Sequence, residues 1–190
     1  MAQLTLERAK EILPKHTTEG HLFTHALAVS SAMGAMAKHF DGDVDHWEAI
    51  GYLHDVDFEK YPEEHCKHVR ELLDGENIDD DDIRAIISHG YGLCTDECVP
   101  ESDMEKSLFT VDELTGIVMT TALMRPTGIS DMEVKSVRKK YKDKKFAAGC
   151  SREVINQGCE MLGLPLDTVI ELTIEGMRGH MDELGLAPKE

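Results

Sequence analysis

Two adjacent residues, His54 and Asp55, have the chemistry that a metal site needs. They follow the apolar run Ala49–Leu53, so we expect the pair to be buried. A buried carboxylate requires a partner charge. A divalent metal can supply that charge, because neutral imidazole and ionised carboxylate are ordinary ligands of catalytic transition metals. A His-Asp dipeptide also arises by chance, so this interpretation depends on further ligands elsewhere in the chain.

Two further candidates lie on predicted helical faces. His25 falls in the apolar stripe of the segment 19–40 and is expected to face the core, although a single core histidine is more often a packed residue than a ligand. Asp112 lies beside the apolar stripe of a long helix predicted over 104–124, with Glu113 next to it. A carboxylate at the margin of such a face is costly unless it is paired or bound to a cation.

Other histidines could complete a site. His65 and His68 lie three apart on a predicted helix, so either can reach it, and we expect His68 to be the solvated one. His89 follows a predicted helix that glycines end, which leaves it at the mouth of whatever the helices enclose. His21 lies one turn before His25 and could pair with it on a metal, but it is nearer the helix start and is expected to be wetter.

Two other clusters have simpler interpretations. The acidic run Asp79–Asp82 precedes an apolar helical segment, where it would cap the helix and complement its dipole; a calcium loop would require alternating ligands and a glycine. Cys94 and Cys98 lie in a polar loop over residues 93–103. Without a second cysteine pair at zinc-finger spacing, they are expected to be ordinary thiols.

The spacing of apolar residues predicts an all-α protein whose candidate ligands lie on different helices. Aromatic residues are few, and Leu, Ile, Met, Ala and Glu are common, a balance that favours helices over strands. The length suits a single domain, 1–190, and we find no internal repeat or linker. The predicted helices cover residues 4–13, 19–40, 44–53, 63–73, the apolar segment up to Ser88, 104–124, 151–162 and 166–184.

The formal net charge is −17, from 20 basic and 37 acidic residues. Such a charge repels phosphate backbones and argues against a nucleic acid polymer as partner. It does not exclude a small anionic substrate, because a metal or a local basic patch can reverse the field inside one pocket. The one basic block, residues 135–145, either forms a solvated helix face or holds substrate phosphate through Lys139, Lys140 and Lys144.

The odd number of cysteines, five, and a start that turns polar after a few residues predict a reduced, cytoplasmic protein. No run of about 18 apolar residues is available to span a membrane, so no membrane partner is expected. The chain also lacks a Gly-x-Ser-x-Gly elbow, a P-loop and a dinucleotide-binding glycine fingerprint.

Taken in chain order, the isolated histidine, the His-Asp doublet and the later aspartate resemble the signature of the HD superfamily of metal-dependent phosphohydrolases. The motifs are His25-Ala26-Leu27-Ala28-Val29, Leu53-His54-Asp55 and Asp112-Glu113-Leu114-Thr115-Gly116. The resemblance runs from about residue 19 to 126, with 127–190 as a helical extension. It implies an HD-domain-like helical bundle with a metal site between its helices.

The resemblance also implies a ligand set. One-metal members of the family use the residues that match His25, His54, Asp55 and Asp112 here. The mixed nitrogen and oxygen ligands suit iron, manganese, zinc, cobalt or nickel.

Two-metal members of the family add histidines at positions that fit His65 and His89, which favours a binuclear site in this chain. The proline that often follows the first added histidine is replaced by Cys66. The choice between His65 and His68 therefore stays open.

If these ligands meet, Asp55 can bridge two cations, which lowers the pKa of a shared water and generates hydroxide near neutral pH. The predicted reaction is hydrolysis of a phosphate ester of a nucleotide or another small phosphorylated metabolite, with Asp55, His89 and Glu113 as catalytic residues. With a single metal, His89, Glu113, Asp57 or Glu59 would handle protons.

Two alternatives to hydrolysis are compatible with these residues. Some HD-type proteins are di-iron oxygenases, and a histidine and carboxylate site that binds iron could act in the same way. The chain could also be a non-catalytic module that binds a metal or a nucleotide. Helical HD-type domains often pair, so a homodimer is a further expectation.

Overall fold

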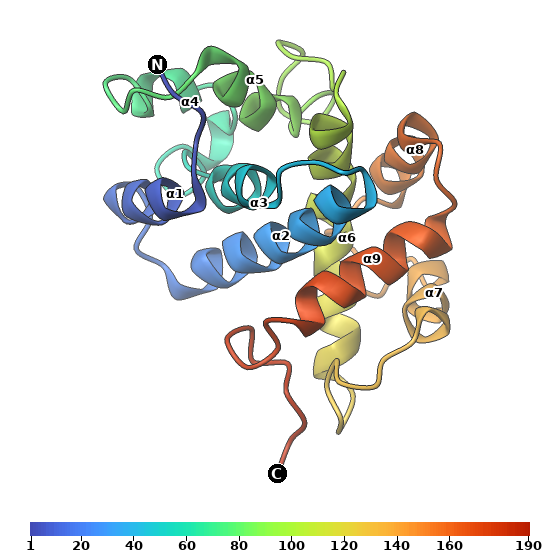
Figure 1. The fold of residues 1–190 in the computed structure, drawn as a ribbon. Helices are drawn as coiled ribbons and strands as arrows, with labels where there is room; N and C mark the ends of the chain where they lie inside the picture. The colour runs from blue at the N-terminus through green and yellow to red at the C-terminus, as the bar shows by residue number, and fades with distance from the viewer.

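The computed structural model describes residues 1–190, and the chain folds into nine α-helices and two short 3-10 helices without a strand (Figure 1). This confirms the predicted all-α fold. None of the helices combines the length and the hydropathy that a membrane span requires. The elements are α1 (Leu6–Ile12), η1 (Leu13–Lys15), α2 (Gly20–His39), α3 (Val44–Leu53), η2 (Pro62–Glu64), α4 (Val69–Leu72), α5 (Asp80–Ser88), α6 (Asp103–Leu123), α7 (Val134–Lys142), α8 (Arg152–Leu162) and α9 (Leu166–Arg178).

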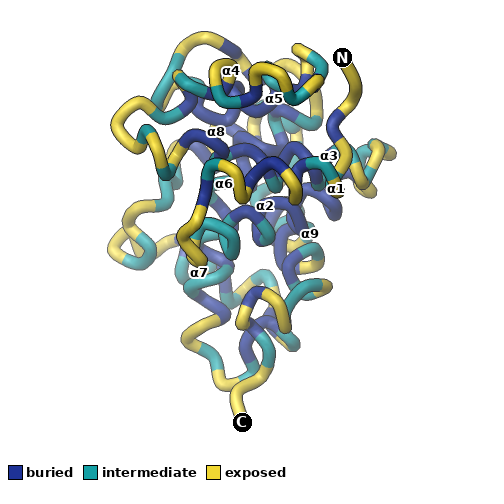
Figure 2. Tube along the Cα trace, turned by 90° about the vertical axis from the view of Figure 1, so that its left-hand side faces the viewer, coloured by how far each residue is buried: buried dark blue, intermediate teal, exposed yellow.

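Helix α2 is the centre of the packing, in contact with α3, α6 and α9. Figure 2 shows the buried residues concentrated where these helices meet. The stretch from Ala26 to Ala37 is almost entirely buried, and its many small side chains allow close approach. Gly51 of α3 and Gly176 of α9 lie against α2 so closely that an added Cβ would come within 3.0 Å of its backbone. Glycine is therefore needed at both crossings.

The register of two helices is set by their N-terminal caps. In α6, the Ser102 side chain accepts from Glu105 N at 3.1 Å, and Glu105 Oε1 accepts from Ser102 N at 2.9 Å, which forms a capping box. In α3, the Asp43 side chain accepts from His46 N at 3.2 Å. These caps fix where each helix begins and so which face carries the candidate ligands further along.

The helix predicted over residues 63–73 does not form, and this prediction was wrong. Pro62–Glu64 make one 3-10 turn, and Val69–Leu72 make a single α-helical turn. Between them Cys66 has a φ of 71°, a left-handed conformation that interrupts a right-handed helix. The two histidines of this segment therefore do not share a helical face.

Two other helices differ from the prediction in detail. Helix α9 ends at Arg178, earlier than expected. The acidic run lies in the first turn of α5, as predicted, but Asp79 makes no side-chain hydrogen bond at the N-cap position. Asp82 is buried and accepts instead from Leu4 N at 2.7 Å and from His46 Nε2 at 2.6 Å. This carboxylate thus ties the N-terminal segment and α3 to α5.

Candidate metal centre

Two of the predicted ligands occupy equivalent places in the fold. His54 is the C-cap of α3, and His89 is the C-cap of α5. Each imidazole Nδ1 donates to a backbone carbonyl one turn earlier, His54 to Gly51 O at 2.7 Å and His89 to Ile86 O at 2.5 Å. A neutral ring that donates from Nδ1 carries a lone pair on Nε2. The two helix ends therefore present Nε2 of both rings to the other candidate ligands.

The first cluster consists of His25, His54, Asp55 and Asp112. His25 Nε2 lies 3.2 Å from His54 Nε2, and Asp112 Oδ1 lies 3.0 Å from the first nitrogen and 3.1 Å from the second. Asp55 Oδ2 lies 3.4 Å from His25 Nε2 and 3.3 Å from His54 Nε2. These five separations are those found among donor atoms that lie roughly 2 Å from a common centre, the distance at which zinc bonds to nitrogen and oxygen, and all four donors lie within 4.8 Å of one another. These donor atoms fit a single ion.

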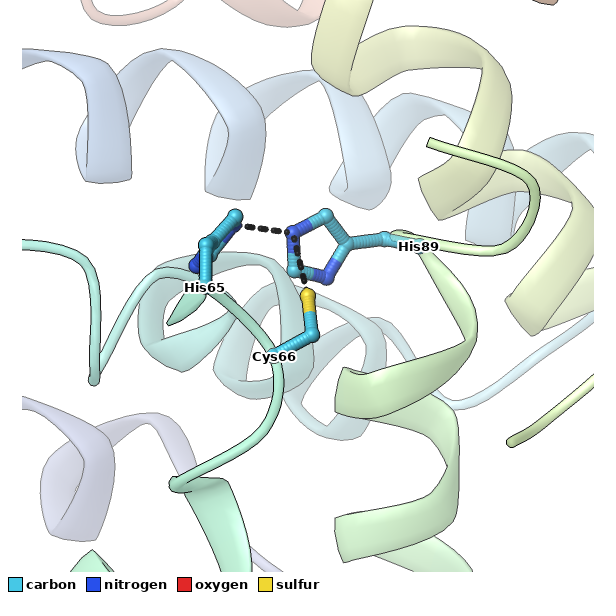
Figure 3. Close-up of side chains that lie close together, drawn as sticks. All are labelled: His65, Cys66 and His89. Atoms are coloured by element: carbon cyan, nitrogen blue, oxygen red, sulfur yellow. Dashed lines mark hydrogen bonds between the residues drawn. The ribbon is translucent and has the colours of Figure 1, made fainter. Parts of the chain in front are cut away.

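The second cluster consists of His65, Cys66 and His89, which converge in Figure 3. His65 Nε2 lies 3.0 Å from His89 Nε2, and Cys66 Sγ lies 3.7 Å from the same nitrogen. Asp55 reaches this cluster as well, because its Oδ1 lies 3.1 Å from His65 Nε2 and 3.4 Å from His89 Nε2. One oxygen of Asp55 thus faces each cluster.

The converging nitrogens call for a cation between them. His65 Nδ1 is 2.8 Å from Asp57 Oδ1, so His65 donates from Nδ1 as His54 and His89 do. In the neutral rings, the facing Nε2 atoms of His65 and His89 would both carry lone pairs and repel each other. A proton or a metal ion removes that repulsion. The donor set, made of imidazole, carboxylate and thiol groups, is one that divalent transition metals bind.

The same electrostatics govern protons at these atoms. Burial alone would lower the pKa of His54, but the carboxylates of Asp55 and Asp112 outweigh it and raise that pKa to about 9. Burial would likewise raise the pKa of both carboxyl groups, yet the neighbouring imidazoles hold each well below its usual range. The pKa values of His65 and His89 are also raised, against burial, by the acidic groups around them. Protons and metal ions therefore compete for the same nitrogens.

The centre is closed on one side and open on the other. His54 is fully buried, and the side chain of His89 is only 2% exposed. The side chain of His25 is 31% exposed, that of Asp55 is 19% exposed and that of Asp112 is 18% exposed. The ligands in contact with solvent therefore lie on α2, on α6 and just after α3.

Comparison with known families agrees with this geometry. Residues 22–108 match the family model of the HD domain. The chain contains an HD domain. The match includes His25, the His-Asp doublet, His65 and His89, and Asp112 lies just beyond its last residue. HD domains bind divalent metals and are generally metal-dependent hydrolases. No curated protein and no solved structure matches the chain significantly.

The structure brings together all the residues that were predicted as metal ligands, including Asp112 beyond the matched residues, and of the two histidines left open it places His65 in the second cluster. His68 lies outside the clusters, with its imidazole 3.1 Å from Glu64 Oε2 and 3.0 Å from Glu71 Oε2. It also stacks on Tyr61, with ring centroids 3.7 Å apart. His68 thus lies beside charged residues, as expected, but its side chain is only 23% exposed rather than fully solvated. His21 is exposed beside Glu19, and it takes no part in either cluster of the domain.

Several predicted residues have other contacts in the HD domain. Glu113 Oε2 accepts from Ser151 N at 2.8 Å, and burial together with Asp112 raises the pKa of Glu113. Glu59 accepts from Thr18 N and Thr18 Oγ1, in the segment just before α2. Glu59 thus supports the helix that carries His25. A catalytic role for Glu113 stays a prediction.

The basic block lies on and after α7, which packs against α6 and α9. Lys139, Lys140 and Lys144 form no hydrogen bond or ion pair with either cluster, and Lys140 Nζ lies over the ring of Phe146. A role of these lysines in holding phosphate stays a prediction.

Cys94 and Cys98 are free thiols that belong to neither cluster.

Two residues, Asp57 and Cys66, are structural parts of the centre that the sequence analysis did not predict as such. Asp57 was expected only as one of four candidates for handling protons. Asp57 is fully buried, and its carboxylate accepts from His65 Nδ1 and from His68 N, the second at 3.2 Å. Its place two residues after Asp55 in the same apolar stretch is a signal that could have indicated this role. Cys66 was noted only as a departure from the family pattern, and its place beside His89 depends on a backbone conformation that the sequence does not reveal.

Proposed function

We propose that this HD-domain protein is a metal-dependent phosphohydrolase that cleaves a phosphate ester of a small phosphorylated metabolite, such as a nucleotide. The observation that carries the proposal is the position of Asp55, whose Oδ2 faces the first cluster and whose Oδ1 faces the second. A carboxylate shared in this way is the arrangement by which two cations are held close together for hydrolysis of phosphate esters.

Two divalent cations, when bound, would act as Lewis acids on the phosphate and acidify a water to provide the nucleophile. The residues of the chain hold and orient the participants. His54 and His89, each locked by a backbone carbonyl, present Nε2 in fixed directions. Asp55 supplies one oxygen to each cluster. Glu113 is the group that we assign to hold a proton, because burial and Asp112 raise its pKa and only one of its oxygens accepts a hydrogen bond.

The open side of the centre suits a small ester. His25, Asp55 and Asp112 are the partly exposed ligands, so a phosphoryl group would approach past them. Phe58 is 37% exposed and lies edge-on to His65, with ring centroids 5.2 Å apart. It offers an apolar surface for the organic part of the substrate. Because the carboxylates repel phosphate, binding requires the cations to be in place first.

The test is an assay of protein that has been stripped with a chelator and then reloaded with manganese, iron, cobalt or zinc. The substrates are p-nitrophenyl phosphate, bis(p-nitrophenyl) phosphate and a panel of nucleoside phosphates. Reloaded protein should release nitrophenolate or inorganic phosphate, and stripped protein should not. His25→Ala should lower turnover roughly 100-fold or more, because it removes a ligand. His21→Ala, on the same helix but exposed, is the matched control and should be unchanged.

Two results would contradict hydrolysis. If the iron form consumes dioxygen and releases no phosphate, the centre is an oxygenase. If the protein binds metal and a nucleotide and turns over none of the substrates, it is a binding module. Equal losses of turnover in His25→Ala and His21→Ala would show that the first cluster does not hold the catalytic metal.

A further inference from the structure

The side chain of Cys66 is held in the second cluster by an uncommon backbone conformation. Its φ of 71° lies in the left-handed region, which residues with a side chain rarely adopt and which proline cannot adopt. The residue is only 1% exposed, and its sulfur points at the ring of His89 (Figure 3). Strain of this kind persists only where the surrounding structure holds it, and it is concentrated at functional sites.

Space for the sulfur is provided by Gly90, the residue after His89. A Cβ on Gly90 would lie 2.5 Å from Cys66 Sγ, closer than real contacts allow. The φ of Gly90 is not positive, so its backbone conformation alone does not require a glycine. The missing side chain instead leaves room for the sulfur beside the imidazole.

The separations within the second cluster match those around a tetrahedral ion. With metal–nitrogen bonds of about 2.0 to 2.1 Å and a metal–sulfur bond of about 2.3 Å, tetrahedral geometry separates nitrogen from sulfur by about 3.6 Å and two nitrogens by about 3.3 Å. Cys66 Sγ lies 3.7 Å from His89 Nε2, and His65 Nε2 lies 3.0 Å from the same nitrogen. Asp55 Oδ1, at 3.1 Å from His65 Nε2 and 3.4 Å from His89 Nε2, provides a fourth donor.

We propose that Cys66 is a metal ligand, so that the second cluster binds its ion through His65, Cys66 and His89 with Asp55 shared between the two sites. This inference rests on the metal centre of the proposed function. When the ion binds, the thiol releases its proton to solvent, and a metal–sulfur bond replaces the sulfur–hydrogen bond. The two sites then differ in chemistry. The first offers nitrogen and oxygen only, whereas the thiolate makes the second favour zinc over manganese.

Cobalt(II) is the probe for this bond, because a cobalt–thiolate bond gives an intense charge-transfer band in the near ultraviolet that nitrogen and oxygen ligands do not give. The full chain, stripped with a chelator, should develop this band on titration with Co²⁺. Cys66→Ser should abolish the band and weaken binding of one ion per chain roughly 100-fold or more, beyond the 10- to 100-fold typical of groups that only orient a ligand. Cys94→Ser is the matched control, since the Cys94 thiol lies beside that of Cys66, and it should keep the band.

The outcomes separate this inference from the proposed function. A cobalt form without the band, a band that survives in Cys66→Ser, or a band lost in Cys94→Ser would overturn the assignment of Cys66. Hydrolysis by a cobalt form that lacks the band would overturn the assignment of Cys66 as a ligand and leave the proposed phosphohydrolase activity standing. The band without hydrolysis would support the assignment of Cys66 and overturn the proposed activity. Failure to bind cobalt at all would overturn both. If Cys66→Ser folds poorly, X-ray absorption of the wild-type zinc form decides, since absence of a sulfur neighbour at about 2.3 Å would contradict the proposal.

Discussion

The two clusters that meet at Asp55 are built on different kinds of structure. The first draws its side chains from α2, α6 and the end of α3, which pack against one another in the core. The second takes only one histidine from a helix end, and its other donors, His65 and Cys66, come from the irregular segment between η2 and α4. A side chain on packed helices is held by many neighbours, whereas one on a loop depends on a few specific hydrogen bonds. The first cluster should therefore be the more rigid of the two.

Removal of the shared carboxylate should have the largest effect, because both clusters use it. Asp55→Ala takes one oxygen from each cluster, so we expect loss of metal from both sites and a fall in turnover of about 1,000-fold or more. Asp112→Ala takes a ligand from the first cluster only, and the second should still bind an ion. Metal analysis of the purified variants makes the comparison. Wild-type metal content in Asp55→Ala would contradict the bridging role.

The first cluster was predictable because helical periodicity reports which side chains face the core. The apolar residues around His25 and Asp112 indicated that both lie at or beside the apolar faces of α2 and α6, although the side chain of His25 is 31% exposed rather than turned fully into the core. The caps of α3 and α6 also agree with the predicted starts of these helices. Local signals and tertiary packing point to the same structure in these segments.

The second cluster was only partly predictable. The residues from 63 to 73 are good helix formers, yet the buried carboxylate of Asp57 bonds to both His65 Nδ1 and His68 N and draws the segment into a loop. A hydrogen bond to a residue outside the segment is invisible to local propensity. The left-handed Cys66 is equally invisible, because such a conformation is expected of glycine or asparagine.

The histidines should make the stripped protein sensitive to pH. The pKa of His54 is raised to about 9 by Asp55 and Asp112, against the effect of burial. A histidine whose pKa is raised in the folded protein stabilises the fold at pH values below its pKa in the unfolded chain, about 6.5. This contribution is lost as the pH rises through its pKa in the folded protein. His54 alone should account for a loss on the order of 3 kcal/mol between about pH 6.5 and 9. His65 and His89 act in the same direction.

The second cluster contains one group, the Cys66 thiol, whose ionisation changes stability with pH in the opposite direction. Burial raises the pKa of the Cys66 thiol, but His89 and His65 lower it to about 7, so the thiolate adds stability as the pH rises above that value. Cys66→Ser should therefore make the decline of the stripped protein steeper. Urea unfolding of stripped and metal-loaded protein across this pH range measures both effects. The loaded protein should change little, since bound ions replace the protons, and a stripped protein that gains stability with rising pH would disprove the prediction.

The smallest effect should come from the residue that orients the loop. Asp57 accepts from His65 Nδ1 at 2.8 Å and from His68 N at 3.2 Å. Asn at this position keeps the volume but offers one accepting oxygen and no charge, so it can hold only one of the two N–H groups, and the contact that orients His65 is weakened. Asp57→Asn should weaken metal binding at the second cluster by about 10- to 100-fold and leave the first unchanged. His68→Ala keeps the backbone N–H and should have no effect. If Asp57→Asn weakens both sites equally, the loop is not what distinguishes the two clusters, and their difference lies in the thiolate alone.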